Sequence, residues 1–496
     1  MSKEDRMNLE DITPFRQSLI DMIEDPGMDG VRLPGGFTSS CAEGGNVSRG
    51  SRPGETSLEN SHRDVTNPSA PRGNDAPHDE FLPLLPGSFS ELGLRSNDIA
   101  PLILKFLLTC GTQTGKEIAR QIRLPLGILG GLLRELKEER LLVYKAAAPA
   151  GDYLYDLTEA GCERGRRYWD QHTYFGSAPV PLSDYIAGVL AQSVRKQSPT
   201  LRDLQRALRD LSVKKAMLIQ LAQAVHSGLG LFLYGAPGNG KTSLAHRITR
   251  AFGQAIWIPR AISIEGNIIR IYDPNNHEPL PLSPEEEIHA GRIDDRWIRI
   301  RRPTILVGGE LTMDNLEIGI NQATGVSEAP LQLKSNCGTL VIDDFGRQRI
   351  SPAELLNRWI LPLEQRRDIL TLANGRKIEV PFDQLIVFST NLEPRELVDE
   401  AFLRRIPYKI EVTDPSEDEF RNLIQQLAST MGIQHDDTPI NHLIENYYSK
   451  HRRMMRYCHP RDIMQQVRTY CTVLDLPMVI TKEAIDAAAK NYFALH

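Results

Sequence analysis

Hydrophobic and polar residues follow one another along the chain in patterns that divide it into regions of different character. Residues 1–24 carry apolar side chains at helical spacing, which predicts a short amphipathic helix. Residues 26–80 are rich in Gly, Ser, Pro and Asn and hold few large apolar residues, which predicts a disordered linker. We therefore expect residues 1–90 to be mostly disordered, with folded domains after them.

Residues 91–172 show three helical patterns followed by two strand-like runs. An apolar helix covers 99–108, Thr114 and Glu117 form a capping box that opens the second helix, and Pro125 opens the third. The strand-like runs flank a short turn, and a last helix follows them. Because three helices and a hairpin resemble a winged helix-turn-helix, we expect a winged-helix α+β domain here.

The third of these helices would be the recognition helix, and it begins with the segment LPLGILGGLL. Direct readout of DNA bases needs Arg, Lys, Asn or Gln near the N-terminal end of such a helix. The first basic residue here is Arg134, more than two turns into the helix. This composition favours a protein-docking or oligomerisation module over a DNA-reading one.

The next region changes from turn residues to a helical pattern. Residues 173–205 contain Gly176, Pro179 and Pro181, and we expect them to form a linker. A helical pattern over 211–225 then leads into the region that carries the chain's main motifs.

An apolar strand at 231–234 runs into a complete phosphate-loop motif, G-x-x-x-x-G-K-T, at residues 235–242. Glycines let backbone N–H groups close around a polyphosphate, and the N-terminus of the following helix adds the positive end of its dipole. Lys241 would reach the β- and γ-phosphates, and the Thr242 hydroxyl would bind Mg²⁺. The sequence thus predicts binding of ATP with Mg²⁺ by Gly235, Pro237, Gly238, Asn239, Gly240, Lys241, Thr242 and Ser243.

A second buried strand, at 338–342, ends in the carboxylates of Asp343 and Asp344. An aspartate at a strand end is more often a helix cap, but after a phosphate loop this pattern resembles a Walker B motif. Asp343 would then hold Mg²⁺ through water, and Asp344 would polarise the attacking water. Asp344 is one methylene shorter than the glutamate usual at this place, so we expect slow turnover.

Three more polar motifs follow in the chain. Asn391 ends a buried strand at 385–390, and the alternative interpretation is a residue that starts a turn. Arg404 and Arg405 lie in the segment AFLRRI, and the alternative interpretation is a solvated basic pair. Arg461 follows a proline at the start of a helical pattern near the C-terminus.

The order of these motifs over residues 212–496 resembles the AAA+ ATPase family. The resemblance implies an α/β fold, in which an αβα core with a parallel sheet occupies residues 206–412. It also implies a helical lid at residues 413–496 and assembly into a homo-oligomer, usually a hexameric ring.

The same resemblance implies roles for the later polar residues. Asn391 would be sensor 1, which orients the attacking water. Arg405 would be the arginine finger for the neighbouring subunit's γ-phosphate, with Arg404 as the alternative, and such a finger contributes about 10³–10⁵ in rate. Arg461 would be sensor 2, which reaches the nucleotide from the lid.

Two features indicate which branch of the family the chain resembles. About 100 residues separate the phosphate loop from the Walker B strand, and this long segment is rich in strand patterns. Residues 369–372 and 377–380 flank an Asn-Gly turn, which predicts a hairpin directly before the strand of Asn391. That placement resembles the pre-sensor-1 hairpin group, which includes MoxR-type chaperones, and it implies that Arg376 and Lys377 lie near a substrate-contacting tip.

Composition limits the remaining choices. The net charge of −6 excludes a global basic field for nucleic acid. The six cysteines form no C-x-x-C motif, which suits a reducing compartment. The chain contains no apolar run of about 20 residues and no signal-peptide core, so we expect a cytoplasmic protein without membrane insertion.

Three functions agree with these observations. The first is an oligomeric, MoxR-like ATPase that remodels a protein client, with the winged helix as a docking module. The second is a DNA-associated ATPase. Three features support it: the winged helix, the hairpin tip, and the basic residues between Arg296 and Arg302. The third is a slowly hydrolysing nucleotide switch, which the short side chain of Asp344 supports.

Overall fold

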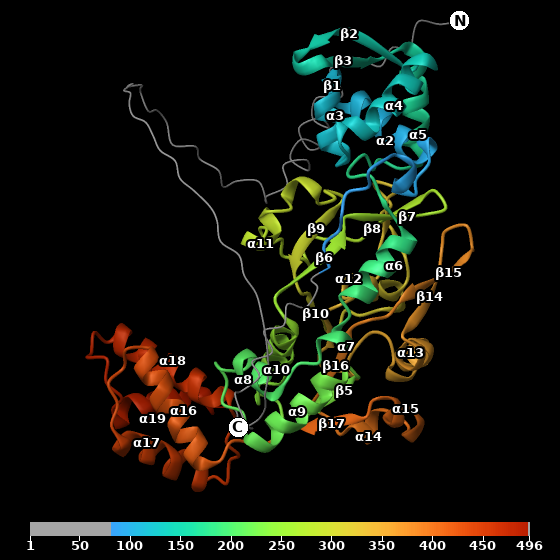
Figure 1. Cartoon of the computed structure of the whole chain (residues 1–496). Coiled ribbons are helices and arrows are strands. Elements are labelled where there is room, and N and C mark those ends of the chain that lie inside the picture. The colour runs from blue at the N-terminus through green and yellow to red at the C-terminus, as the bar shows by residue number, and fades with distance from the viewer. Residues whose placement is uncertain (1–80, 495–496) are drawn as a thin grey trace, which may run out of the picture. The chain divides into compact units, whose positions relative to one another are not determined.

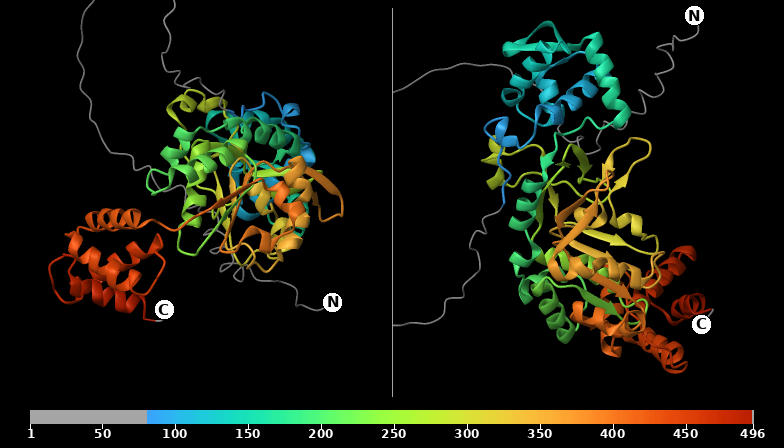
Figure 2. Two further views of the ribbon diagram at one scale, coloured as in Figure 1. Left: turned by 90° about the horizontal axis from the view of Figure 1, so that it is seen from below. Right: turned by 90° about the vertical axis from the view of Figure 1, so that its right-hand side faces the viewer.

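The computed structural model describes residues 81–494 of the chain. The amphipathic helix expected within 1–24 and the linker expected at 26–80 lie outside the described residues. Figures 1 and 2 show the described elements, which are named here by the labels of Figure 1.

Residues 96–171 form a small helical domain with a three-stranded antiparallel sheet of order β1–β3–β2. The predicted capping box is present, because the Thr114 hydroxyl accepts a hydrogen bond from Glu117 N at 3.2 Å. Thr158 caps the last helix by accepting from Gly161 N at 3.0 Å. The expected helices and hairpin are confirmed as α2 (Ser96–Cys110), β1 (Gln113–Thr114), α3 (Gly115–Ile122), α4 (Leu126–Glu138), β2 (Leu142–Ala148), β3 (Asp152–Leu157) and α5 (Glu159–Gln171).

A five-stranded parallel sheet of order β10–β13–β16–β5–β17 forms the centre of the larger domain. β5 enters the phosphate loop and lies between β16 and β17. Because the strands are parallel, their carboxyl ends meet at one edge, where ligands of such sheets bind. The strands are β5 (Leu231–Tyr234), β10 (Thr304–Val307), β13 (Thr339–Ile342), β16 (Leu385–Thr390) and β17 (Tyr408–Glu411).

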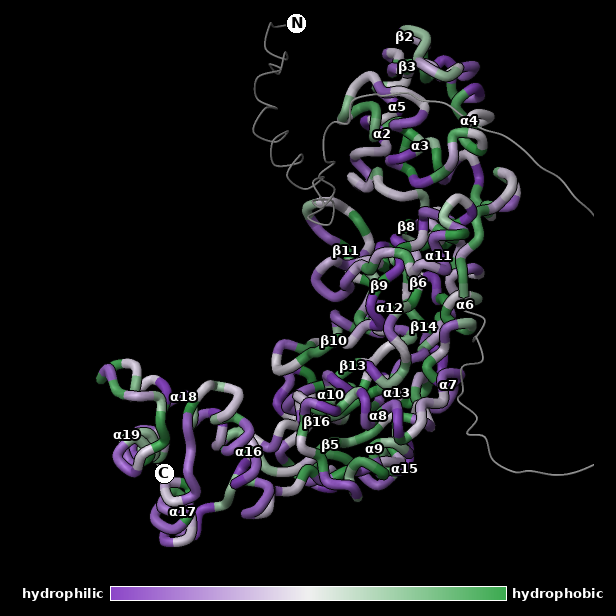
Figure 3. Tube along the Cα trace, turned by 60° about the vertical axis from the view of Figure 1, so that its left-hand side comes forward, coloured by the Kyte–Doolittle hydropathy of each residue, from purple (hydrophilic) through white to green (hydrophobic). Residues whose placement is uncertain are grey.

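Alternation along the strands places an apolar cluster on each face of this sheet. Leu231 belongs to the cluster that α9 (Lys215–Ser227) and α10 (Lys241–Ile248) cover. The neighbouring Phe232 belongs to the opposite cluster, which α13 (Pro352–Gln365) covers. The green, hydrophobic course of β5 and α9 is visible in Figure 3. The predicted α/β fold, with helices on both faces of a parallel sheet, is therefore present.

Residues 254–337, between the phosphate loop and β13, form the β-rich insert. One part is the antiparallel pair β6–β9, and another is a sheet of order β11–β12–β8–β7, to which β4 (Val180–Pro181) from before the insert adds a fifth strand. Branched residues such as Ile258, Ile262 and Ile300 share an apolar cluster. The expected strand content is confirmed by β6 (Ala255–Pro259), β7 (Ala261–Ile264), β8 (Asn267–Arg270), β9 (Trp297–Arg301), β11 (Gly319–Ile320) and β12 (Ser327–Glu328).

The hairpin expected before β16 is formed by β14 (Arg367–Thr371) and β15 (Lys377–Pro381). Its connection is longer than a two-residue Asn-Gly turn. Gly375 N donates to Leu372 O at 2.8 Å, and Gly375 has a φ of 79°. A three-residue connection of this kind ends in a left-handed residue, and glycine supplies that conformation without strain.

Residues 173–205 form regular structure where the sequence predicts a linker. β4 (Val180–Pro181) pairs with β7, and α6 (Leu182–Ala191) places Tyr185 and Val189 in the apolar cluster of the insert. The glycine and prolines mark only the extended part before α6. Apolar residues at helical spacing then form a helix because the insert offers a surface on which to bury them.

The segment 81–90, which the sequence places in the disordered region, packs on the β-rich insert. The ring of Phe81 lies 5.4 Å from the ring of Trp297. Leu85 N donates to Arg292 O at 2.8 Å. Folded structure therefore begins earlier than expected, because the first large apolar residues after the polar region find partners in the insert.

The C-terminal residues form the all-helical domain that the resemblance implied, called the lid below. Phe420, Tyr448, Met464 and Ile485 are among the residues of its own apolar core. In residues 81–494, no helix is both long and apolar enough to cross a membrane. The helices of the lid are α16 (Glu417–Thr430), α17 (Asp437–Leu443), the π-helix η7 (Ile444–Ser449), α18 (Cys458–Val473) and α19 (Lys482–Tyr492).

Candidate nucleotide-binding site

The phosphate loop connects β5 to α10 at the carboxyl edge of the sheet. Gly235, Gly238 and Gly240 have φ values of 133°, 82° and 80°, which residues with a side chain rarely adopt. A Cβ atom at Gly235 would lie 2.6 Å from Val412 O, and one at Gly238 would lie 2.5 Å from Cys458 Sγ. Glycine is therefore required at these two positions by the backbone path and by the close approach of other segments.

Lys241 is the first residue of α10, and its ammonium group is held inside the loop. Nζ donates to Gly235 O at 2.9 Å, to Ala236 O at 3.0 Å and to Asn391 Oδ1 at 2.7 Å. Burial lowers the pKa of Lys241 although the Walker B aspartates oppose this, and the positive charge of Arg456 adds to the decrease. A phosphate group could replace these neutral acceptors with stronger, charged ones.

The other two loop residues of the prediction differ in exposure. Pro237 is exposed at the turn of the loop, whereas Ser243 is half-buried in the first turn of α10. Ser243 O accepts a hydrogen bond from Arg247 Nη1 at 3.0 Å.

Thr242 and Asp343 meet at the same edge of the sheet. Thr242 Oγ1 donates to Asp343 Oδ2 at 2.8 Å, which joins the start of α10 to the end of β13. Hydroxyl and carboxylate oxygens are ligands of Mg²⁺, which usually keeps waters and phosphate oxygens as its other ligands. Among the described residues, no group of three His, Cys, Asp or Glu side chains could hold a metal ion. This donor pair therefore fits a magnesium ion that arrives with a nucleotide.

Asp344 and Asn391 are the remaining predicted polar residues at this edge of the sheet. Asn391 Nδ2 donates to Asp344 Oδ1 at 3.3 Å, while Asn391 Oδ1 accepts from Lys241. Asp344 is exposed and has a φ of 48°, in the left-handed region. Asp is enriched in that region compared with longer side chains. The backbone thus supplies a reason for aspartate in the place where glutamate is usual.

Arg404 and Arg405 end α15 (Glu400–Arg405), and their surroundings differ. Arg405 Nε lies 2.7 Å from Glu364 Oε1, Nη1 donates to Ala401 O at 3.1 Å, and its side chain is 25% exposed. Arg404 is exposed and makes no hydrogen bond or ion pair with the rest of residues 81–494. Of the two arginines, only Arg404 is free to reach another molecule without breaking an ion pair.

Arg461 lies in the first turn of α18, the lid helix whose start touches the phosphate loop. Cys458 N donates to Gly238 O at 2.9 Å. The Arg461 side chain is 72% exposed, and its Nε is 3.6 Å from Asp462 Oδ1. The structure therefore brings the helix of Arg461 to the loop but shows no contact between the guanidinium and the loop.

Two further charged residues meet the phosphate loop, and sequence reasoning missed both. Asp414 Oδ1 accepts a hydrogen bond from Asn239 Nδ2 at 2.7 Å and forms an ion pair with Arg456 Nη1. Asn239 itself was predicted as a loop residue. Asp414 and Arg456 belong to none of the motifs used here, and the basic segment KHRRMMR before Arg461 was the only available signal.

The basic residues between Arg296 and Arg302 do not form an exposed patch. Arg296 and Asp294 pair at 2.7 Å with side chains only 1% and 3% exposed. Arg299 pairs with Glu286 at 2.7 Å, and Arg302 is buried. Most of these charges therefore stabilise the insert, and the support that they gave to DNA binding is lost.

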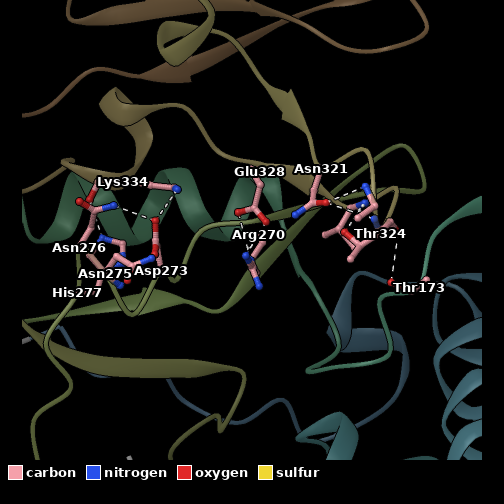
Figure 4. A network of polar contacts seen from close by, with 12 residues as sticks. Thr173, Arg270, Asp273, Asn275, Asn276, His277, Asn321, Thr324, Glu328 and Lys334 are labelled. Carbon is pink, nitrogen blue, oxygen red and sulfur yellow. Dashed lines mark hydrogen bonds and ion pairs between the residues drawn. The ribbon is translucent and has the colours of Figure 1, made fainter. Parts of the chain in front are cut away.

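A second polar network, in the β-rich insert, is shown in Figure 4. Lys334 Nζ pairs with Asp273 Oδ2 at 2.7 Å, and both side chains are nearly buried. His277 Nδ1 lies 3.0 Å from Asp273 N, and Nε2 lies 2.9 Å from Lys334 O. Because Nδ1 can only accept from the amide, Nε2 carries the proton and donates to the carbonyl. Burial lowers the pKa of His277, so this neutral ring is a structural link between loops.

Lys241, Thr242, Asp343, Asp344 and Asn391 meet at the carboxyl edge of the sheet, which is called the nucleotide edge from here on. A parallel sheet carries a phosphate loop, two Walker B aspartates and Asn391 at one edge, and a helical domain follows. This arrangement agrees with the α/β core and the helical lid that the order of motifs implied.

The chain is similar to one family model and to solved structures. A family model described as "Domain of unknown function (DUF8689)" matches residues 416–491, within the lid. No curated protein matches the chain. The RuvB Holliday junction branch migration motor of Thermotoga maritima is 14% identical with a TM-score of 0.34, over 57% of this chain and 71% of that chain. NtrX from Brucella abortus in complex with ATP is 14% identical with a TM-score of 0.36, over 59% and 61%.

Proposed function

We propose that the protein hydrolyses ATP as an oligomer and remodels a protein complex in the manner of MoxR-type chaperones. One observation carries the ATPase part of this proposal. Lys241, Asn391 and Asp344 form a continuous chain of hydrogen bonds beside the Thr242–Asp343 pair. Phosphate binding, metal binding and water activation thus have side chains at one edge of one sheet.

Each of these residues has a distinct part in the proposed reaction. Lys241 and the loop amides bind the phosphates of the substrate ATP. Thr242 and Asp343 would hold Mg²⁺, which when bound neutralises charge on the phosphates. Asp344 and Asn391 would orient the attacking water toward the γ-phosphate, and the carboxylate of Asp344 would accept its hydrogen bond.

Assembly into an oligomer is proposed because a cation that stabilises charge on the γ-phosphate accelerates its transfer. An arginine supplied in trans provides such a charge in related chemistry. Arg404 is exposed and unpaired within the described residues, so it could be donated to a neighbouring subunit. Arg405 could serve only after leaving Glu364.

A protein client is proposed rather than DNA. The basic residues from Arg296 to Arg302 are largely engaged within the insert. At the tip of the β14–β15 hairpin, Arg376 forms an ion pair with Glu265 of the β7–β8 turn. The surface at the hairpin tip therefore presents both positive and negative charge, which suits a polypeptide better than a polyanion.

A slowly hydrolysing nucleotide switch is the second candidate. The left-handed backbone of Asp344 supports it, because this conformation favours a short side chain that reaches the water less well. Both candidates share the same nucleotide site and differ in turnover.

Phosphate release by the full chain, measured across protein concentrations, tests the proposal. We expect turnover per subunit to rise with concentration, because the shared site forms only on assembly. Lys241→Ala should abolish nucleotide binding, while Lys215→Ala, at an exposed lysine of α9, should leave it unchanged. Turnover that is independent of concentration would contradict a site shared between subunits.

The client is tested with Asp344→Asn, which should bind ATP without hydrolysing it. We expect the variant, isolated from its native lysate with ATP, to retain a protein that nuclease treatment does not release. Recovery of DNA that nuclease removes would instead support a DNA-associated ATPase.

A further inference from the structure

The connector between the core and the lid, residues 412–416, holds a carboxylate with two partners. Asp414 Oδ1 accepts from Asn239 Nδ2 of the phosphate loop at 2.7 Å. The same oxygen pairs with Arg456 Nη1 of the lid. The side chains of Asp414 and Arg456 are each 24% exposed, and Asn239 is 4% exposed. One carboxylate therefore ties the loop to the lid.

Backbone contacts around Asp414 fix the same connector. Asn239 Nδ2 also lies 3.2 Å from Val412 O. Lys214 Nζ donates to Asp414 O at 2.8 Å. Because these contacts hold the main chain, the Asp414 side chain can lose a partner without the connector losing its place.

Lys241 and Arg456 are two cations near the phosphate loop, where Asp343 and Asp344 act on Lys241 and Asp414 pairs with Arg456. Arg456 is near enough to Lys241 to lower the pKa of the lysine, so the two cations share one field. The carboxylate of Asp414 contacts one of them. A polyphosphate in the loop would attract both cations and would repel the carboxylate. Hydrogen bonds from a guanidinium to phosphate are charge-assisted and can be bidentate.

We propose that Asp414 and a bound nucleotide compete for Arg456, and that the nucleotide takes the guanidinium from the carboxylate. Asp414 and Arg456 are thus positioning residues of a latch between lid and phosphate loop. The latch opens more completely for a triphosphate than for a diphosphate, because the larger negative charge competes better for the guanidinium. This inference rests on the proposed ATP binding and deepens it.

Titration of the full chain with fluorescent mant-ATP and mant-ADP, in the presence of Mg²⁺, tests the latch. Asp414→Asn keeps an oxygen acceptor for Asn239 but removes the charge that competes with phosphate. We expect it to tighten mant-ATP binding by about fivefold and mant-ADP binding by less. Arg456→Gln should weaken mant-ATP binding by about tenfold.

The double variant makes the test specific. If Asp414 acts through Arg456, Asp414→Asn should give no tightening in the Arg456→Gln background. Glu419→Gln is the matched control, because Glu419 lies 3.6 Å from Lys214 in the same region and contacts no loop residue. Gln also preserves the capping box that Glu419 forms with Ser416. We expect its nucleotide affinities to equal those of the wild type.

The outcomes separate the latch from the proposed function. Failure of the wild-type chain to bind either nucleotide would overturn ATP binding itself. Normal binding by the wild type with equal effects of Asp414→Asn on both nucleotides, or with no tightening, would overturn the latch alone. Should Arg456→Gln fail to fold, Arg456→Lys retains the charge and should weaken mant-ATP binding to a smaller extent.

Discussion

The nucleotide edge and the β-rich insert are both rich in charged side chains, yet they use them differently. At the nucleotide edge, Lys241 and Asn391 bond to each other and to acceptors that a ligand could replace. In the insert, Arg296 and Asp294 are almost fully buried and satisfy each other. Both regions contain paired charges, so the replaceability of the partners distinguishes a binding site from a structural network.

The physical reason lies in the cost of losing a partner. Lys241 is also buried, but its acceptors are neutral oxygens, so charged phosphate oxygens can replace them and bind more strongly. A buried charge that loses its partner is left without compensation in a low-dielectric interior. Substitutions at the edge should therefore change chemistry, whereas substitutions in the insert should change stability.

The largest expected effect concerns the arginines of α15. Arg404→Ala should lower turnover by about 10³-fold or more while ATP binding persists, because the exposed Arg404 is free to act in trans. Arg405→Ala should cost much less, since Arg405 is held by Glu364 at 2.7 Å. Steady-state phosphate release and mant-ATP binding would be measured on both variants.

The opposite order of these two effects would show that Arg405 leaves Glu364 on assembly. Glu364→Gln serves as the control, because it frees Arg405 without removing it. If turnover of that variant rises, the finger is Arg405 and the ion pair restrains it.

Next in size is the buried pair of the insert. Arg296→Met leaves Asp294 buried without a charged partner and should lower the free energy of unfolding by about 3–5 kcal/mol. Arg301→Met removes an arginine whose pair with Glu278 is 58% and 59% exposed, so it should cost at most about 1 kcal/mol. Urea unfolding of both variants would check the difference. Equal costs would mean that burial does not decide how much an ion pair of the insert contributes to stability.

The sequence pointed to side chains that the structure brings together at the nucleotide edge, because each motif there is local. The glycines, Lys241 and Thr242 lie within one loop and helix start, and Asn391 ends a strand of continuous apolar residues. Contacts between distant segments could not be predicted in this way. Asp414 meets Asn239 across 175 residues, because the fold and not the local pattern brings them together.

The same limit explains the errors in domain boundaries. Residues 173–205 contain turn residues, and nothing nearby in the sequence shows that Tyr185 and Val189 will be buried by the insert. The basic run from Arg296 has the composition of an exposed patch, and only tertiary contacts show that most of it is internal. Local patterns identify elements and motifs, whereas burial is decided by partners far away in the chain.

Lys105 in α2 gives a smaller, pH-dependent effect in a third setting. It is fully buried, and its Nζ lies 3.1 Å from His172 O and 3.2 Å from His172 Nδ1. Burial lowers the pKa of Lys105 to about 7. Burial and the neighbouring Lys105 lower the pKa of His172 to about 4, so this ring is neutral above that pH.

Stability should therefore rise with pH above 7. Between about pH 7 and 10 the unfolded chain binds a proton on Lys105 that the folded chain does not, which adds about 1.4 kcal/mol of unfolding free energy per pH unit. Below pH 7 both states bind the proton, and the slope from Lys105 vanishes. Urea midpoints at pH 7 and 9 would be compared between the wild type and Lys105→Met, in which the difference should disappear.

The smallest expected effect is the most informative about the second candidate function. Asp344→Glu extends the carboxylate by one methylene toward the water, so we expect turnover to rise by about two- to fivefold, less than 1 kcal/mol of barrier. The left-handed backbone at φ 48° opposes this gain, because a longer side chain is less favoured there. The unfolding free energy should fall by about 1 kcal/mol at most. Phosphate release reports how the longer side chain changes turnover, and urea unfolding reports the backbone strain that it causes. Unchanged turnover with an unchanged unfolding free energy would show that the length of this side chain does not limit hydrolysis, and the argument for a slow switch would then lose its basis.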